Sequence, residues 1–298
     1  MELEPPSAWV DEWTNRFLSA FPVNCSFRTG VLDQRQFHSH SGFELYVCVR
    51  GSGSYIAGDR VYDLSPGALI VVRPKALHIS RPDPDLPFHR FVLAVEDSYM
   101  HELQASDEAL SAWMRPWLPE PGQDSLYSRL GAQQLLAVQE TLSQLEQELA
   151  RREAGYPLAV KSLVLRLFAE LNRNRAEPLQ TSADAEAHKQ LIERILSFLM
   201  EHYQEPLTAE RLCRYFNLSR SYLFLLFKRH TGATINEFVV TYRLSKAKEL
   251  LQTTALPIIE VAAASGFNDI SHFCHTFKRV AGLTPSQYRA VHGSCSAG

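Results

Sequence analysis

The feature that most constrains the fold of this 298-residue chain is a repeat within its last hundred residues. The segment RLCRYFNLSRSYLFLLFKRHTGATINEF aligns with EVAAASGFNDISHFCHTFKRVAGLTPSQY, at an offset of 49 that becomes 50 after one extra residue in the second copy. The matched positions at the later offset include Leu223 and Phe273, Phe227 and Phe277, Lys228-Arg229 and Lys278-Arg279, Gly232 and Gly282, and Thr234 and Thr284. Two copies of one unit are therefore present.

Each copy has the pattern of two helices joined by a tight turn. In the first copy, Thr208 can cap one helix and Ser219 can cap a second helix that ends before Gly232. In the second copy, Gly266 marks the bend and Asp269 can cap the helix that follows. The sequence therefore predicts two helix-turn-helix units.

Between the copies, residues 235–251 carry apolar side chains at helical spacing, which predicts one continuous helix. At 1.5 Å per residue, its roughly 17 residues span about 25 Å. Such a spacer could hold two recognition helices near the ~34 Å repeat that brings successive major grooves to one face of DNA. A generic helical repeat that binds protein is the alternative.

Charge is divided unevenly along the chain, whose net charge is −3. Residues 188–298 contain 13 Lys and Arg against 8 Asp and Glu, whereas residues 1–187 contain 17 against 25. A basic C-terminal part is typical of a domain that binds a polyanion, although many ordinary domains reach this balance. Residues 174–187 lack apolar periodicity and contain Pro178, so we expect an interdomain linker there.

Residues 207–290 resemble the DNA-binding domain of the AraC/XylS family of transcriptional regulators. The stretch GFNDISHFCHTFKRVAGLTPSQYR is similar to that family's signature in its second helix-turn-helix. The resemblance implies recognition helices at residues 219–229 and 269–279, with double-stranded DNA as the partner. The residues that it places against DNA are Arg220, Ser221, Phe224, Leu225, Lys228, Arg229, Arg243, Ile270, Ser271, Cys274, His275, Lys278 and Arg279.

Two of these residues, Phe224 and Leu225, depart from the family pattern, which commonly has a small or polar residue followed by a basic or polar one. Apolar side chains can contact thymine methyl groups but cannot hydrogen-bond to base edges. We therefore expect direct readout by the first unit to be weak or directed to thymine. Packing of both residues against a partner or against the N-terminal domain is the alternative.

The N-terminal region has a different pattern. Between about residues 24 and 95, the segments FELYVCV, GSYIA, ALIVV and RFVLAV are rich in β-branched and aromatic residues and are separated by Gly, Pro, Asp and Ser. Short strands at this spacing predict a small barrel or sandwich. From residue 128 onward, leucines at helical spacing predict a helical hairpin, which either packs on the barrel or forms a dimerisation surface.

Histidine and glutamate residues cluster near the first of these strands. His38 and His40 are expected on the same face of a strand, Glu44 follows four positions later, and His78 comes after the strand at residues 68–72. Three imidazoles and one carboxylate could hold a divalent transition metal with open coordination positions. Direct contact with an effector and a purely structural hydrogen-bonding role are the alternatives.

This stretch is similar to the cupin motif His-x-His-x-x-x-Glu, which is followed here by Gly51, by Ser65-Pro66-Gly67 and by His78. The resemblance implies a cupin-like barrel that receives a small-molecule effector, a fold that AraC-family sensor domains commonly have. Cupin-like regulators often keep such polar residues without using a metal. The candidate effector-binding residues are His38, His40, Glu44, Tyr46, Tyr55 and His78.

Cysteine usage and hydropathy indicate a cytoplasmic protein. The five cysteines are widely spaced and contain no CxxC pair, so we expect reduced thiols rather than a disulfide framework. No apolar run approaches the roughly 20 residues of a membrane span, and the first residues lack the basic and apolar regions of a signal peptide. Neither membrane insertion nor secretion is expected.

The expected fold class is α+β, with a cupin-like sensor domain at residues 1–125, a helical dimerisation region at 126–173, a linker at 174–187 and an all-α double helix-turn-helix domain at 188–298. The family resemblance implies a one-component transcriptional activator that acts as a homodimer with RNA polymerase. Its precedent favours a sugar or sugar derivative as effector, with aromatic acids and other metabolites as alternatives. No cofactor is expected apart from the metal considered above. A metal-dependent cupin enzyme that carries a DNA-binding domain is one alternative, and a constitutive DNA binder whose barrel only dimerises is another.

Overall fold

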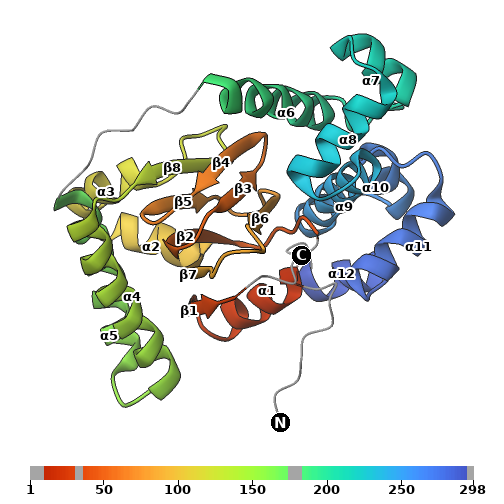
Figure 1. Ribbon diagram of the computed structural model, residues 1–298. Coiled ribbons are helices and arrows are strands. Elements are labelled where there is room, and N and C mark those ends of the chain that lie inside the picture. The colour runs from red at the N-terminus through yellow and green to blue at the C-terminus, as the bar shows by residue number, and fades with distance from the viewer. Residues whose placement is uncertain (1–9, 31–35, 174–182, 294–298) are drawn as a thin grey trace. The chain divides into compact units, whose positions relative to one another are not determined.

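The computed structural model describes residues 10–30, 36–173 and 183–293 (Figure 1). The chain divides into two compact units, one comprising Asp11–Asp33 with Ser39–Ala187 and the other including His188–Gly298. The first unit contains strands and helices, and the regular elements described within residues 188–298 are all helical. The α+β fold class is thus confirmed. Among the described residues, no helix is long and apolar enough to cross a membrane.

The described strands of the N-terminal unit form two antiparallel sheets. A five-stranded sheet has the order β1-β7-β2-β5-β8, and a three-stranded sheet has the order β4-β3-β6. The strands are β1 (Val23–Thr29), β2 (Gly42–Arg50), β3 (Gly53–Ala57), β4 (Arg60–Leu64), β5 (Ala68–Val72), β6 (His78–Pro82), β7 (His89–Glu96) and β8 (Ser125–Arg129). The segments expected as strands from their composition lie within β2, β3, β5 and β7.

Both faces of the five-stranded sheet are buried. Leu45 and Val47 of β2 belong to the core that the sheet shares with helices, while Tyr46 and Cys48 belong to the core between the two sheets. Successive side chains of a strand point to opposite faces, so Glu44 lies on the same face as Tyr46. The pleat of β2 therefore directs a carboxylate between the sheets, where it is 6% exposed.

The helices of this unit are α1 (Val10–Ala20), α2 (Asp97–Ala105), α3 (Glu108–Met114), α4 (Ala132–Arg151) and α5 (Tyr156–Arg173), with a 3₁₀ turn at Arg115–Trp117. As expected from the leucine spacing, α4 and α5 form a hairpin and lie side by side (Figure 1). Strand β8 overlaps the start of the range 126–173 that was expected to be a helical hairpin. It pairs with β5 from Ala68↔Arg129 to Val72↔Ser125 and so completes the sheet.

The C-terminal unit contains two helix pairs joined by one long helix. Its helices are α6 (Ala183–Glu201), α7 (Ala209–Phe216), α8 (Arg220–Thr231), α9 (Ile235–Thr253), α10 (Ile258–Ala264), α11 (Ile270–Ala281) and α12 (Pro285–His292). Helices α7 and α8 form the first expected unit, α10 and α11 form the second, and α9 is the continuous connection. Residues 174–182 of the expected linker lie outside the described residues, and residues 183–187 begin α6.

The two recognition helices begin and end in the same way. The side chains of Ser219 and Asp269 each accept a hydrogen bond from the backbone N–H three residues later, which caps α8 and α11. Both helices end at a glycine in the left-handed conformation, Gly232 at φ 72° and Gly282 at φ 67°. The structure therefore confirms the duplicated helix-turn-helix pattern read from the sequence.

Candidate functional site

Helices α8 and α11 expose most of the residues that the family resemblance places against DNA. The exposed residues are Arg220, Ser221, Leu225, Lys228 and Arg229 on α8, and Ile270, Ser271, His275, Lys278 and Arg279 on α11. Phe224 and Cys274 are half-buried. The opposite faces carry fully buried phenylalanines, Phe227 and Phe273 among them, so packing within each unit fixes which side of the helix faces outward.

Arg243 of α9 has a different environment. Its Nε donates a hydrogen bond of 2.7 Å to the carbonyl of Tyr203, and its Nη2 donates one of 3.0 Å to the carbonyl of Glu205. Desolvation by burial lowers the pKa of Arg243. These contacts tie α9 to the turn that follows α6, so the guanidinium has a positioning role, and its contact with DNA stays a prediction.

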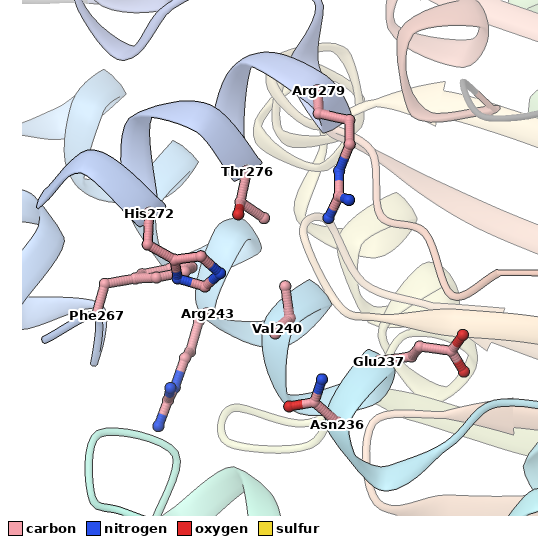
Figure 2. Close-up of a pocket in the computed structure, with 8 residues that line it drawn as sticks. All are labelled: Asn236, Glu237, Val240, Arg243, Phe267, His272, Thr276 and Arg279. Atoms are coloured by element: carbon pink, nitrogen blue, oxygen red, sulfur yellow. The ribbon is translucent and has the colours of Figure 1, made fainter. Parts of the chain in front are cut away.

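A pocket of about 340 Å³ lies between α9 and α11 (Figure 2). Figure 2 shows Asn236, Glu237 and Val240 coming from α9, and His272, Thr276 and Arg279 coming from α11. Arg279 therefore lines this pocket, although its role at DNA stays a prediction. The sequence interpretation missed His272, an exposed imidazole in the first turn of α11.

The structure brings the predicted polar residues of the N-terminal region together. His38, His40, Glu44 and His78 are all buried, and one ligand atom from each lies within 4.8 Å of the others. The expectation that His38 and His40 share a strand was wrong, because β2 begins only at Gly42.

The loop that carries His40 is held by α1. The side-chain oxygen of Asn15 accepts hydrogen bonds from the backbone N–H of Ser41 at 2.9 Å and from its hydroxyl at 3.0 Å. Gly42 follows, and a Cβ at that position would lie 2.5 Å from the carbonyl oxygen of Val95. This close packing sets the direction in which the loop enters β2 and thus where the His40 imidazole lies.

Both imidazole rings have the same hydrogen-bonding pattern. Nδ1 of His40 lies 3.0 Å from the carbonyl oxygen of Gly42, and Nδ1 of His78 lies 3.0 Å from that of Ala76. A carbonyl oxygen only accepts, so each Nδ1 carries a proton. The two Nε2 atoms then face Oε2 of Glu44, at 3.2 Å for His40 and 3.5 Å for His78.

The centre of this arrangement needs a proton or a cation. An imidazole lone pair repels an ionised carboxylate oxygen at such distances, so a proton on Nε2, a proton on the carboxyl group or a bound cation must lie between them. Burial by itself raises the pKa of Glu44, but His78 and His40 hold it well below its ordinary value. Imidazoles fixed through Nδ1 by backbone carbonyls are oriented as metal ligands commonly are, so the donor set fits a divalent transition metal.

Two tyrosines connect the sheets beside this cluster. Tyr55 on β3 donates a hydrogen bond of 2.7 Å to Oε1 of Glu44 on β2, and the hydroxyl oxygens of Tyr46 on β2 and Ser80 on β6 lie 2.7 Å apart. The two aromatic rings lie with centroids 4.7 Å apart. Burial raises the pKa of both phenols. The space between the sheets therefore combines neutral hydroxyl groups with one carboxylate.

The sequence interpretation missed Ser80 and Arg90. Arg90 on β7 is 3% exposed, and its Nη1 donates a hydrogen bond of 3.1 Å to the carbonyl of Gly30. Burial lowers the pKa of Arg90. The alternation with Val92, which belongs to the core between the sheets, could have placed Arg90 on that inner face.

Comparison with known proteins agrees with both parts of this description. The AraC-like ligand binding domain matches residues 25–168, and a helix-turn-helix domain matches residues 212–290. The chain belongs to the AraC family of transcriptional regulators. Its AraC-like ligand binding domain contains His40, Glu44 and His78, and its helix-turn-helix match contains α8 and α11.

Relatives of this AraC-family chain include two proteins named HTH-type transcriptional activator RhaR. The one from Cronobacter sakazakii is 28% identical over 260 residues, which cover 86% of this chain and 87% of the relative. The one from Klebsiella pneumoniae is 29% identical over 259 residues, which cover 85% and 86%. A solved structure, the C-terminal domain of the two-component response regulator yesN from Fusobacterium nucleatum, shares 35% identity over 34% of this chain and 98% of its own, with a TM-score of 0.33. The two matched domains make this AraC-family chain a DNA-binding regulator with a ligand-binding domain.

Proposed function

We propose that this protein is a one-component transcriptional activator in which a small molecule bound between the two sheets controls DNA binding by α8 and α11. The observation that carries the proposal is that one chain combines a buried polar cluster, within a ligand-binding domain, with two matched helices that expose cations. The names of the RhaR relatives support activation as the outcome.

DNA binding follows from the ends of the recognition helices. Lys228-Arg229 and Lys278-Arg279 lie in the last turns of α8 and α11, and all four side chains are exposed. Cations that neutralise phosphates release condensed counterions, so affinity falls as the salt concentration rises. We expect binding to duplex DNA with strong salt dependence.

A sugar or sugar derivative is the proposed effector. Hydroxyl groups of such a ligand need paired donors and acceptors, which the Glu44 carboxylate, the two phenols and the Ser80 hydroxyl supply. The rings of Tyr46 and Tyr55 also offer apolar faces to the C–H groups of a sugar ring. The buried guanidinium of Arg90 would favour a derivative with an acidic group.

A homodimer formed through α4 and α5 is the proposed assembly, with RNA polymerase as a further partner in the cytoplasm. Leu136 of α4 is 67% exposed and Leu158 of α5 is 73% exposed, whereas the other leucines of the hairpin are buried or half-buried in the core shared with the sheet. Exposed leucines on a paired helical surface support contact with a second copy. Replacing both with glutamate should shift the protein to a monomer in analytical ultracentrifugation.

The effector proposal is tested by thermal shift with a panel of neutral sugars, sugar acids and sugar phosphates. A ligand that binds only the folded state stabilises it by about 2.7 kcal/mol at a hundredfold excess over its Kd. The shift should appear in the parent and in His101→Ala, which removes an exposed imidazole paired with Asp97. It should vanish in His40→Ala. A His40→Ala protein that melts lower yet keeps the full shift would show that the cluster is only structural.

A divalent transition metal is a second candidate ligand, favoured by the two Nε2 atoms that face one carboxylate oxygen. Residues His40, Glu44 and His78, with His38, would hold it and leave positions open for an effector. Elemental analysis after dialysis against Zn²⁺, Ni²⁺ or Mn²⁺ should give one metal per parent chain and none per Glu44→Gln chain. Turnover of a substrate by the metal-loaded protein would favour the enzyme alternative.

A further inference from the structure

The outward face of α8 is apolar at its centre. Leu225 is 69% exposed and Tyr222 is 43% exposed, and Phe224 beside them is half-buried. The opposite face is already filled, because Leu223 and Phe227 are fully buried. We call Tyr222, Phe224 and Leu225 the α8 patch; it contributes little to the core of its own unit.

Cations surround the α8 patch. Arg220 lies in the first turn of the helix with its guanidinium 5.9 Å from the ring centroid of Phe224, and Lys228 and Arg229 lie in the last turn. The sequence of α8, RSYLFLLFKRHT, contains no acidic residue. An apolar protein surface would leave these cations without partners, whereas a polyanion with apolar groups between its charges matches both features.

The major groove of duplex DNA offers such a surface. Its floor carries hydrogen-bonding base edges and one apolar group, the 5-methyl of thymine, and its walls are phosphates. At the offset of 50, Phe224 and Leu225 correspond to Cys274 and His275 of α11. His275 is exposed and can hydrogen-bond to a base edge, whereas Leu225 cannot. The two helices therefore differ in the chemistry with which they can read bases.

We propose that α8 recognises thymine methyl groups through Leu225 and Phe224, whereas α11 reads base edges through His275. The inference rests on the proposed function, because it requires α8 to enter the major groove. It assigns the target site two unlike halves. One half is specified by the positions of thymines on either strand, and the other is specified by hydrogen-bonding patterns.

The test begins with selection of duplexes from a random library by the full-length protein. The His275→Ala protein identifies the half contacted by α11, because it should lose base preference there. Each thymine of the other half is then replaced by deoxyuridine, which lacks only the 5-methyl group. We expect about fourfold weaker binding at one or two positions, since burying one methyl group contributes about 0.8 kcal/mol.

Variants of the patch complete the test. The Leu225→Ala protein should bind equally to the two duplexes that differ by thymine or deoxyuridine at the position that Leu225 contacts, because the side chain that detects the methyl group is gone. Val291→Ala is the matched control, since Val291 on α12 is 65% exposed and lies outside both recognition helices; it should keep the fourfold difference.

Two results would overturn the inference. Selective binding that is insensitive to deoxyuridine at every position would exclude methyl recognition while leaving DNA binding by the protein in place. A Leu225→Ala protein that binds both duplexes more weakly, yet still distinguishes thymine from deoxyuridine, would assign the patch to a protein contact. Failure of the parent to select any sequence would instead contradict the proposed function, so the two failures can be told apart.

Discussion

Nε of Arg243 donates a hydrogen bond of 2.7 Å to the backbone carbonyl of Tyr203. The same guanidinium reaches the carbonyl of Glu205, so one side chain of α9 holds the turn after α6. Charged donors make the stronger hydrogen bonds, and two carbonyls lose a partner when the side chain is removed. We therefore predict that Arg243→Ala lowers the free energy of unfolding by about 1 to 3 kcal/mol. Urea denaturation measures this loss.

The salt dependence of DNA binding tests whether Arg243 also contacts a phosphate. A residue that neutralises a phosphate contributes about 0.9 to the slope of log K against log salt concentration. Lys228→Ala should reduce this slope. Arg243→Ala should leave the slope unchanged if the guanidinium only positions the turn, and should reduce it if the guanidinium also contacts a phosphate, as the family resemblance implies. Unchanged stability of the Arg243→Ala protein would contradict the positioning role.

Gly266 lies against the same turn. Its φ of +86° is in the left-handed region, and an added Cβ would lie 2.8 Å from the carbonyl oxygen of Tyr203. The left-handed conformation alone costs other residues about 1 to 2 kcal/mol, and the backbone contact adds to that cost. We predict that Gly266→Ala destabilises the protein by more than about 2 kcal/mol, measured by thermal and urea denaturation.

Gly155 supplies a matched comparison for this substitution. Its φ of +87° is nearly the same, but no atom lies within 4 Å of an added Cβ. Gly155→Ala should therefore show the conformational cost alone. Equal losses of unfolding free energy for the two variants would show that the turn at Tyr203 moves away easily and does not hold α10 and α11 closely.

The helix-turn-helix part could be predicted because its signals are local. Ser219 and Asp269 cap helices that begin at the next residue, and the repeat marks both positions independently. Thr234 and Thr284 also begin capping boxes at the same offset of 50. The side-chain directions were not predictable in this way, because the contact of Arg243 with Tyr203 spans 40 residues.

The sequence predicted which residues form the sensor cluster but not how they are arranged. The motif identified His40, Glu44 and His78, but the loop geometry depends on Asn15, which lies 26 residues before Ser41. Ser80 reaches Tyr46 only because β6 and β2 belong to sheets that face each other. Such distant contacts leave no periodic signal in one sequence. The expectation of a shared strand face for the two histidines was wrong because β2 begins only at Gly42.

His230, in the last turn of α8, stacks on His188 of α6 with ring centroids 6.3 Å apart. Burial lowers the pKa of His230 below its ordinary value of 6.5, and the nearby His188 and Arg229 lower it further. The unfolded chain therefore binds a proton at His230 at a higher pH than the folded chain does. Stability from this group is fully present above about pH 6.5 and is lost as the pH falls through the lowered folded value.

His230→Gln should remove this part of the pH dependence. The urea midpoints of parent and variant should converge or change order as the pH is lowered from about 8 to about 5, a range in which histidines titrate. His202→Gln is a comparison, because His202 is paired with Glu205 at 2.9 Å and lies outside the stack. A constant difference in urea midpoint between the parent and the His230→Gln protein across this pH range would contradict the prediction.

The hydrogen bonds of Tyr55 and Tyr46 provide a test of the charge on Glu44. Tyr55 donates to the carboxylate at 2.7 Å, whereas Tyr46 pairs with the neutral hydroxyl of Ser80 at the same distance. Both rings are fully buried, so replacing either with phenylalanine removes one hydroxyl group from a similar environment. Tyr55→Phe should cost about 1.5 to 3 kcal/mol and Tyr46→Phe about 0.5 to 1.5 kcal/mol, because a hydrogen bond to a charged group contributes more than one between neutral groups.

A double-mutant cycle with Glu44→Gln makes this last prediction specific to the carboxylate. In the Glu44→Gln background the acceptor is a neutral amide oxygen, so Tyr55→Phe should cost no more than Tyr46→Phe does in the parent. Chemical denaturation of the four proteins gives the coupling between Glu44 and Tyr55 as a difference in free energy of unfolding. A coupling near zero would mean that Glu44 is protonated in the folded barrel. The two imidazole Nε2 atoms would then face a neutral carboxyl group that can itself donate a hydrogen bond, and the case for a protonated imidazole or a bound cation would fall with it.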